Sequence, residues 1–115
     1  MWTLLRREPY RLFFPLGIGF GCLGAGHWLA YAAGWSEGYS GFFHAAIQTG
    51  AFLPSFIVGF LLTALPRFTA APAATSAEVL VFLSLLVAQP LCAARGAWVA
   101  AECCALAWLV ALAVF

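Results

Sequence analysis

Hydrophobic positions fall into four long runs, separated by short segments rich in polar residues, glycine or proline. The runs predict helices over residues 12–33, 41–65, 77–94 and 97–115. A helix needs about 20 apolar residues to cross a bilayer, with a lower limit of about 17. We therefore predict an all-α integral membrane bundle with about four transmembrane helices, forming a single membrane domain over residues 1–115.

The segments between the runs carry turn and helix-end signals. Residues 34–39 combine two glycines with two aromatic residues of the kind found at membrane interfaces. We expect Pro66 and Arg67 to close the second helix, and Ser76 with Glu78 to begin the third.

A stripe of polar and small residues runs along the second predicted helix. His44, Gln48, Ser55, Gly59 and Thr63 recur at helical spacing and so share one face. Polar groups in hydrocarbon cost free energy unless they meet a partner. The stripe therefore marks either a seam with another helix or a functional site.

Glycines give the first predicted helix a face of its own. Gly17, Gly21 and Ala25 follow the small-xxx-small spacing that allows close helix contact. Gly24 and His27 also share a face. A glycine beside a histidine leaves room either for a flat macrocycle or for another helix.

Composition supports the membrane assignment. The chain is 65% hydrophobic and 8% charged, with a mean hydropathy of +1.01, whereas soluble domains are about a quarter charged. No basic patch suggests a nucleic-acid partner, so we expect the lipid bilayer and other membrane helices, or a homo-oligomer, as partners. All four cysteines lie in or beside apolar runs, which favours small hydrophobic side chains over a disulfide framework.

Basic residues predict the orientation. Four arginines lie before or at the start of the first helix or in the second loop: Arg6, Arg7, Arg11 and Arg67. Only Arg95 lies in the other short turns. The positive-inside rule then predicts a cytoplasmic N-terminus. Ala30-Tyr31-Ala32 resembles a signal cleavage site, but the run before it has the length of a span.

Unusual side chains gather near the outer ends of the predicted helices. His27 and His44 are expected at similar depth on neighbouring helices, and Glu102 lies at a comparable depth in the last one. Imidazole is a common ligand of haem iron and of copper. We therefore name His44, His27 and Glu102 as candidate ligands, with hydrogen bonding across a helix seam as the alternative for each histidine.

Two segments resemble the NnrS family. They are Glu8–Gly17, which reads EPYRLFFPLG, and Gly59–Thr69, which reads GFLLTALPRFT, with His44 between them. The resemblance covers about residues 8–72. It implies a bacterial polytopic membrane protein containing haem and copper and linked to the nitric oxide response. Where the family often reads His-Ala-His, this chain has Ala46 in place of the second histidine.

The resulting hypothesis is an NnrS-like protein that binds haem through His44, with His27 as a second ligand and copper as a further candidate cofactor. Such a protein would bind nitric oxide, sense it or relieve nitrosative stress rather than catalyse a defined turnover. One alternative is a structural or assembly subunit of a larger membrane complex. Another is a transporter portion that uses Glu102 as a proton site.

Overall fold

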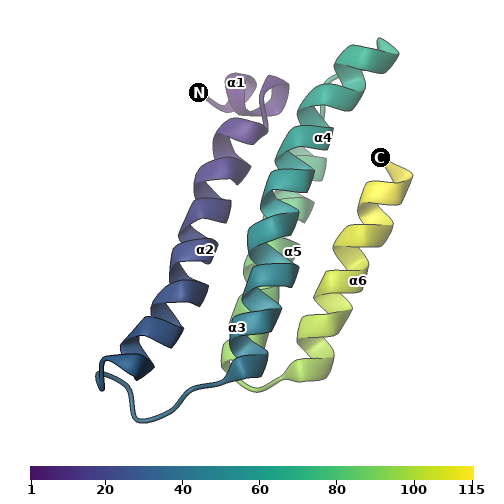
Figure 1. Cartoon of the computed structure of the whole chain (residues 1–115). Helices are drawn as coiled ribbons and strands as arrows, with labels where there is room; N and C mark the ends of the chain where they lie inside the picture. The colour runs from purple at the N-terminus through teal and green to yellow at the C-terminus, as the bar shows by residue number, and fades with distance from the viewer.

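The structure is a computed structural model that describes all residues from Met1 to Phe115. Long helices run antiparallel beside one another, and both termini lie at the same end of the bundle (Figure 1). There are no strands. The elements in chain order are α1 (Trp2–Arg7), α2 (Tyr10–Ala32), α3 (Gly41–Ile47), the π-helix η1 (Gln48–Phe52), α4 (Leu53–Thr69), α5 (Ser76–Ala94) and α6 (Trp98–Val114).

The all-α membrane bundle predicted from the sequence is confirmed. Three helices are long and apolar enough to cross a membrane: α2, the continuous α3–η1–α4 rod of 29 residues, and α5. Helix α6 is apolar but has only 17 residues, at the lower limit for a span.

Helix ends follow local chemistry. Thr75, one residue before the predicted start, caps α5, and its hydroxyl accepts a hydrogen bond from the backbone N–H of Glu78 at 3.2 Å. The Glu78 carboxylate accepts the Thr75 N–H in return, which completes a capping box. Pro66 was expected to end the second helix, but α4 continues to Thr69 and stops where Ala70 turns left-handed, with φ of 56°.

Two helix pairs make up the bundle. Helix α2 packs along α3, η1 and α4, while α5 packs along α6 and also touches α3 and η1. Where the pairs meet, Phe13, Val58, Phe82 and Trp108 belong to one buried apolar cluster. Large apolar side chains on the outer faces of the helices are exposed, as expected for surfaces that meet lipid.

Glycines bring α2 close to its neighbour. A Cβ at Gly17 would lie 2.8 Å from Phe56, at Gly21 2.8 Å from Phe52, and at Gly24 2.5 Å from the Gln48 amide. The predicted glycine face is therefore a helix seam, although its third member is Gly24 and not Ala25, which is exposed.

The π-helix η1 meets α5 through one buried amide. Gln89, only 1% exposed, donates from Nε2 to the Ala46 carbonyl at 3.1 Å. A Cβ at Gly50 would lie 2.4 Å from the same nitrogen. The wide turn and the absent side chain at Gly50 thus make room for Gln89, whose Oε1 atom has no hydrogen-bond partner.

Candidate functional site

The polar stripe of the α3–η1–α4 rod faces α2. Gln48 Nε2 lies 3.4 Å from the Gly21 carbonyl, and the Thr63 hydroxyl accepts from the Tyr10 N–H at 3.3 Å. The Ser55 and Thr63 hydroxyls donate back to carbonyls one turn earlier in their own helix, at 2.7 Å each. The stripe is therefore a helix seam along its length, and any ligand chemistry is concentrated at its His44 end.

His44 is held by a backbone carbonyl of α2. Its Nδ1 atom lies 2.9 Å from the Gly24 oxygen. A carbonyl can only accept, so Nδ1 carries the proton, and in a neutral imidazole Nε2 then keeps its lone pair. Many metal-binding histidines have this arrangement, with one ring nitrogen anchored and the other left for the metal.

His27 has the opposite arrangement. Its Nε2 atom accepts a hydrogen bond from the Ser40 N–H at 3.1 Å. The ring stacks on Tyr39, with centroids 5.4 Å apart, and meets Phe43 edge-on at 5.1 Å. To ligate a metal through Nε2, His27 would have to release Ser40.

Tyr39 joins the two histidines. Its ring centroid is 6.4 Å from that of His44 and 5.4 Å from that of His27, and its third aromatic neighbour is Tyr31. The sequence alone predicts only that Tyr39 is an aromatic residue of an interfacial loop. Its contact with both imidazoles depends on the loop folding back onto α2. The Ser40–His27 hydrogen bond holds the loop in that position.

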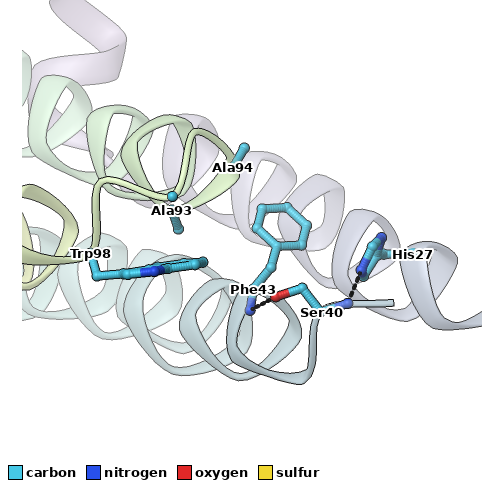
Figure 2. Close-up of a pocket in the computed structure, with 7 residues that line it drawn as sticks. His27, Ser40, Phe43, Ala93, Ala94 and Trp98 are labelled. Atoms are coloured by element: carbon cyan, nitrogen blue, oxygen red, sulfur yellow. Dashed lines mark hydrogen bonds between the residues drawn. The ribbon is translucent and has the colours of Figure 1, made fainter. Parts of the chain in front are cut away.

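A cavity of about 430 Å³ lies beside His27 at this end of the bundle. Figure 2 shows His27 and Trp98 on opposite sides, with Phe43 between them and Ser40 bonded to both His27 and the Phe43 backbone. Gly96, with φ of 71°, forms the tight α5–α6 turn in its wall. The seven lining residues are His27, Ser40, Phe43, Ala93, Ala94, Gly96 and Trp98.

The structure does not bring Glu102 into a ligand cluster. Glu102 is exposed on α6, which packs mainly against α5, and has no hydrogen-bond or ion-pair partner. No group of three or more His, Cys, Asp or Glu side chains is arranged to hold a metal ion. All four cysteines are free; Cys22 and Cys103 are exposed on the outside of the bundle.

A second polar cluster lies at the other end. Glu8 pairs with Arg11 through one carboxylate oxygen and lies 3.5 Å from Arg67 through the other. The Arg11 hydrogen bond, with the charges of both arginines, lowers the pKa of the Glu8 carboxyl. Glu8 and Arg11 come from one of the two segments that resemble NnrS, and Arg67 comes from the other. The fold brings these segments together.

Comparisons with known proteins give one match. Neither the curated proteins nor the solved structures include a match to this chain. The NnrS protein family matches residues 4–115, so the similarity extends beyond the expected residues 8–72 and includes the last two helices. This chain belongs to the NnrS family.

Proposed function

We propose that this NnrS-family membrane protein binds haem through His44 and takes part in the nitric oxide response. Family membership supports the role in the nitric oxide response. The observation that carries the haem assignment is the hydrogen bond from His44 Nδ1 to the Gly24 carbonyl, at 2.9 Å. It leaves Nε2 as the nitrogen that can ligate iron.

The residues around His44 limit where a haem would lie. The space beside Gly24 is filled by Ile47 and Gln48, so the seam itself has no room for a macrocycle. The cavity beside His27 falls within the usual range of ligand pockets, about 300–1,000 Å³, but His44 is not among the residues that line it. His27 would serve as the second ligand only after giving up its bond to Ser40.

Bound haem would supply an iron that takes nitric oxide as a ligand. The chain would anchor His44 through Gly24 and surround the outer end with Tyr39 and Phe43. Copper is a weaker proposal, because the two histidines have no third His, Cys, Asp or Glu beside them. Family membership and the apolar helices support a location in the bacterial inner membrane, and the distribution of arginines supports a cytoplasmic N-terminus.

The test is an absorption spectrum of protein purified from haem-replete bacteria. We expect a Soret band that shifts when nitric oxide is added to the reduced protein. His44→Ala should abolish the band, and His27→Ala should shift or weaken it. Gln48→Ala, one turn away on the same face, is the control and should keep the pigment.

A colourless wild-type preparation, or an unchanged spectrum in His44→Ala, would contradict the haem proposal. Size-exclusion chromatography of each variant would separate loss of ligand from loss of fold.

The second candidate is a structural or assembly subunit without its own cofactor. The observation in its favour is α6, which packs mainly on α5 and exposes a large apolar face; Leu106 is 62% exposed and Val110 64%. This role predicts that the protein co-purifies with a partner or a second copy, and that His44→Ala changes no pigment.

A further inference from the structure

Positive charge gathers at the end of the bundle opposite the histidines. Four of the five arginines lie there: Arg6, Arg7, Arg11 and Arg67. Glu8 and Glu78 are the acidic residues at this end. The arginines are therefore only partly neutralised within the chain.

Two of the four arginines at this end have few or no hydrogen-bond or ion-pair partners within the chain. Arg11 pairs closely with Glu8, and Arg6 donates from Nε to the Ala74 carbonyl at 3.2 Å. Arg67 reaches the same carboxylate only at 3.5 Å, and its side chain is 59% exposed. Arg7 has no hydrogen-bond or ion-pair partner. Arg7, which has no partner, and Arg67, whose only partner is Glu8 at 3.5 Å, are thus the guanidinium groups most available to an external anion.

These two arginines line one cavity of about 260 Å³ between α1, α4 and the loop that follows α4. Thr63 also reaches the cavity, but its hydroxyl is already bonded to the Gly59 carbonyl and to the Tyr10 N–H. The remaining walls are apolar. An anion here would be recognised by the guanidinium groups alone.

An apolar groove of about 320 Å³ adjoins this cavity and shares Thr63 and Arg67 with it. Its aromatic walls are Tyr10, Phe14, Phe60 and Phe68, of which Phe60 is 54% and Phe68 81% exposed. Arg67 therefore stands between a charged cavity and an aromatic groove. A ligand that fills both has an anionic head and an apolar tail.

We propose that this end of the protein binds an anionic phospholipid. The phosphate lies between Arg7 and Arg67, and an acyl chain lies in the groove beside Phe14 and Phe60. Guanidinium groups bind phosphate oxygens strongly, and basic pockets between membrane helices recognise anionic headgroups. The adjoining groove favours a lipid over free phosphate.

The experiment is native mass spectrometry of the purified full chain with added phosphatidylglycerol or phosphatidylcholine. We expect wild-type protein to retain phosphatidylglycerol preferentially. Arg7→Gln and Arg67→Gln should each lower that retention about fivefold, the usual contribution of one arginine at an anionic membrane surface. Arg95→Gln, in the turn at the other end, is the matched control and should have no effect.

Two further arms separate the lipid from its phosphate. Long-chain phosphatidylglycerol should outcompete the dihexanoyl form, and excess inorganic phosphate should not displace it. Equal retention of phosphatidylcholine, an equal loss in Arg95→Gln, or displacement by inorganic phosphate would overturn the proposal. Arg7→Gln keeps the test valid if Arg67→Gln disturbs folding, because Arg7 has no internal partner to lose.

Discussion

Gly24 and Gly26 differ in what surrounds them, although they are two positions apart on the same helix. A Cβ at Gly24 would lie 2.5 Å from the Gln48 amide and 2.6 Å from Ile47, whereas a Cβ at Gly26 meets nothing within 4 Å. We expect Gly24→Ala to destabilise the protein by about 1–3 kcal/mol, because a tightly packed seam must open to admit a methyl group.

Gly26→Ala is the matched control for this prediction. It adds the same methyl group to the same helix on an open face, and helix propensity then favours alanine slightly. Thermal unfolding in detergent, followed by loss of the monodisperse peak, should show a lower midpoint for Gly24→Ala alone. Equal midpoints for the two variants would mean that the seam is looser than described.

The Glu8 carboxylate makes stability depend on pH. Its pKa lies below the ordinary value of 4.5, because Arg11 bonds to the charged form and Arg67 adds a second positive charge. The stabilisation is therefore present above pH 4.5 and is lost as the pH falls through the lower, folded-state pKa. We expect the thermal midpoint of the wild type to fall over that range.

Glu8→Gln should lower the midpoint at neutral pH and remove this part of the pH dependence. The two proteins should therefore converge in acid. A constant difference in midpoint at every pH would show that the Glu8 charge has no role in stability.

At the scale of elements, the π-helix η1 keeps the polar faces of α3 and α4 on the same side of the rod. His44 and Thr63 are 19 positions apart, which in a regular α-helix would place them about 100° apart around the axis. Both nevertheless face α2. The wide turn of η1 absorbs one extra residue and so keeps both on the seam.

Single-residue deletions test this role of η1. Deleting Thr49, an exposed residue inside η1, should convert the segment to α-helix and leave both halves facing α2. Deleting Ile57, which is 44% exposed in α4, should rotate Thr63 away from the seam by about 100°. Thermal midpoints should therefore fall much further for the Ile57 deletion, and the opposite order would contradict the phase argument.

Much of this helical organisation is predictable from the sequence, because helix length in a bilayer and the spacing of polar residues are local properties. The stripe from His44 to Thr63 and the glycines of the first helix both identify the seam. The π-helix is not predictable in this way. Its sequence, QTGAF, has no feature that excludes a regular α-helix, and the side chain that packs against it, Gln89, belongs to a distant helix.

The candidate site is less accessible to sequence reasoning. Similar depth brings His27 and His44 to one end, but depth cannot say which ring nitrogen is free. That depends on the Gly24 carbonyl and the Ser40 N–H, which belong to other segments. Likewise, the ion pair of Glu8 with Arg67 requires the start of α2 and the end of α4 to meet, whereas the Glu8–Arg11 pair is local, three positions apart.

At the scale of the whole molecule, the two ends are chemically distinct and predict an orientation. Both termini lie at one end of the bundle (Figure 1). Four of the five arginines belong to that end, and both histidines belong to the other. In a variant whose native cysteines are replaced by alanine, Gly38→Cys should react with an impermeant maleimide added outside intact spheroplasts. Ala71→Cys, in the loop after α4, should react only after the membrane is permeabilised. The reverse pattern would invert the orientation.

Gly24 connects the spacing of two helices to the chemistry of an imidazole. Its missing side chain lets α2 approach the α3–η1–α4 rod closely, and its carbonyl accepts the hydrogen bond from His44 Nδ1. Separating the helices would weaken that hydrogen bond and free the imidazole to exchange its proton between the two nitrogens. The tautomer populations of His44, measured from its ¹⁵N chemical shifts, would therefore change when the two helices move apart.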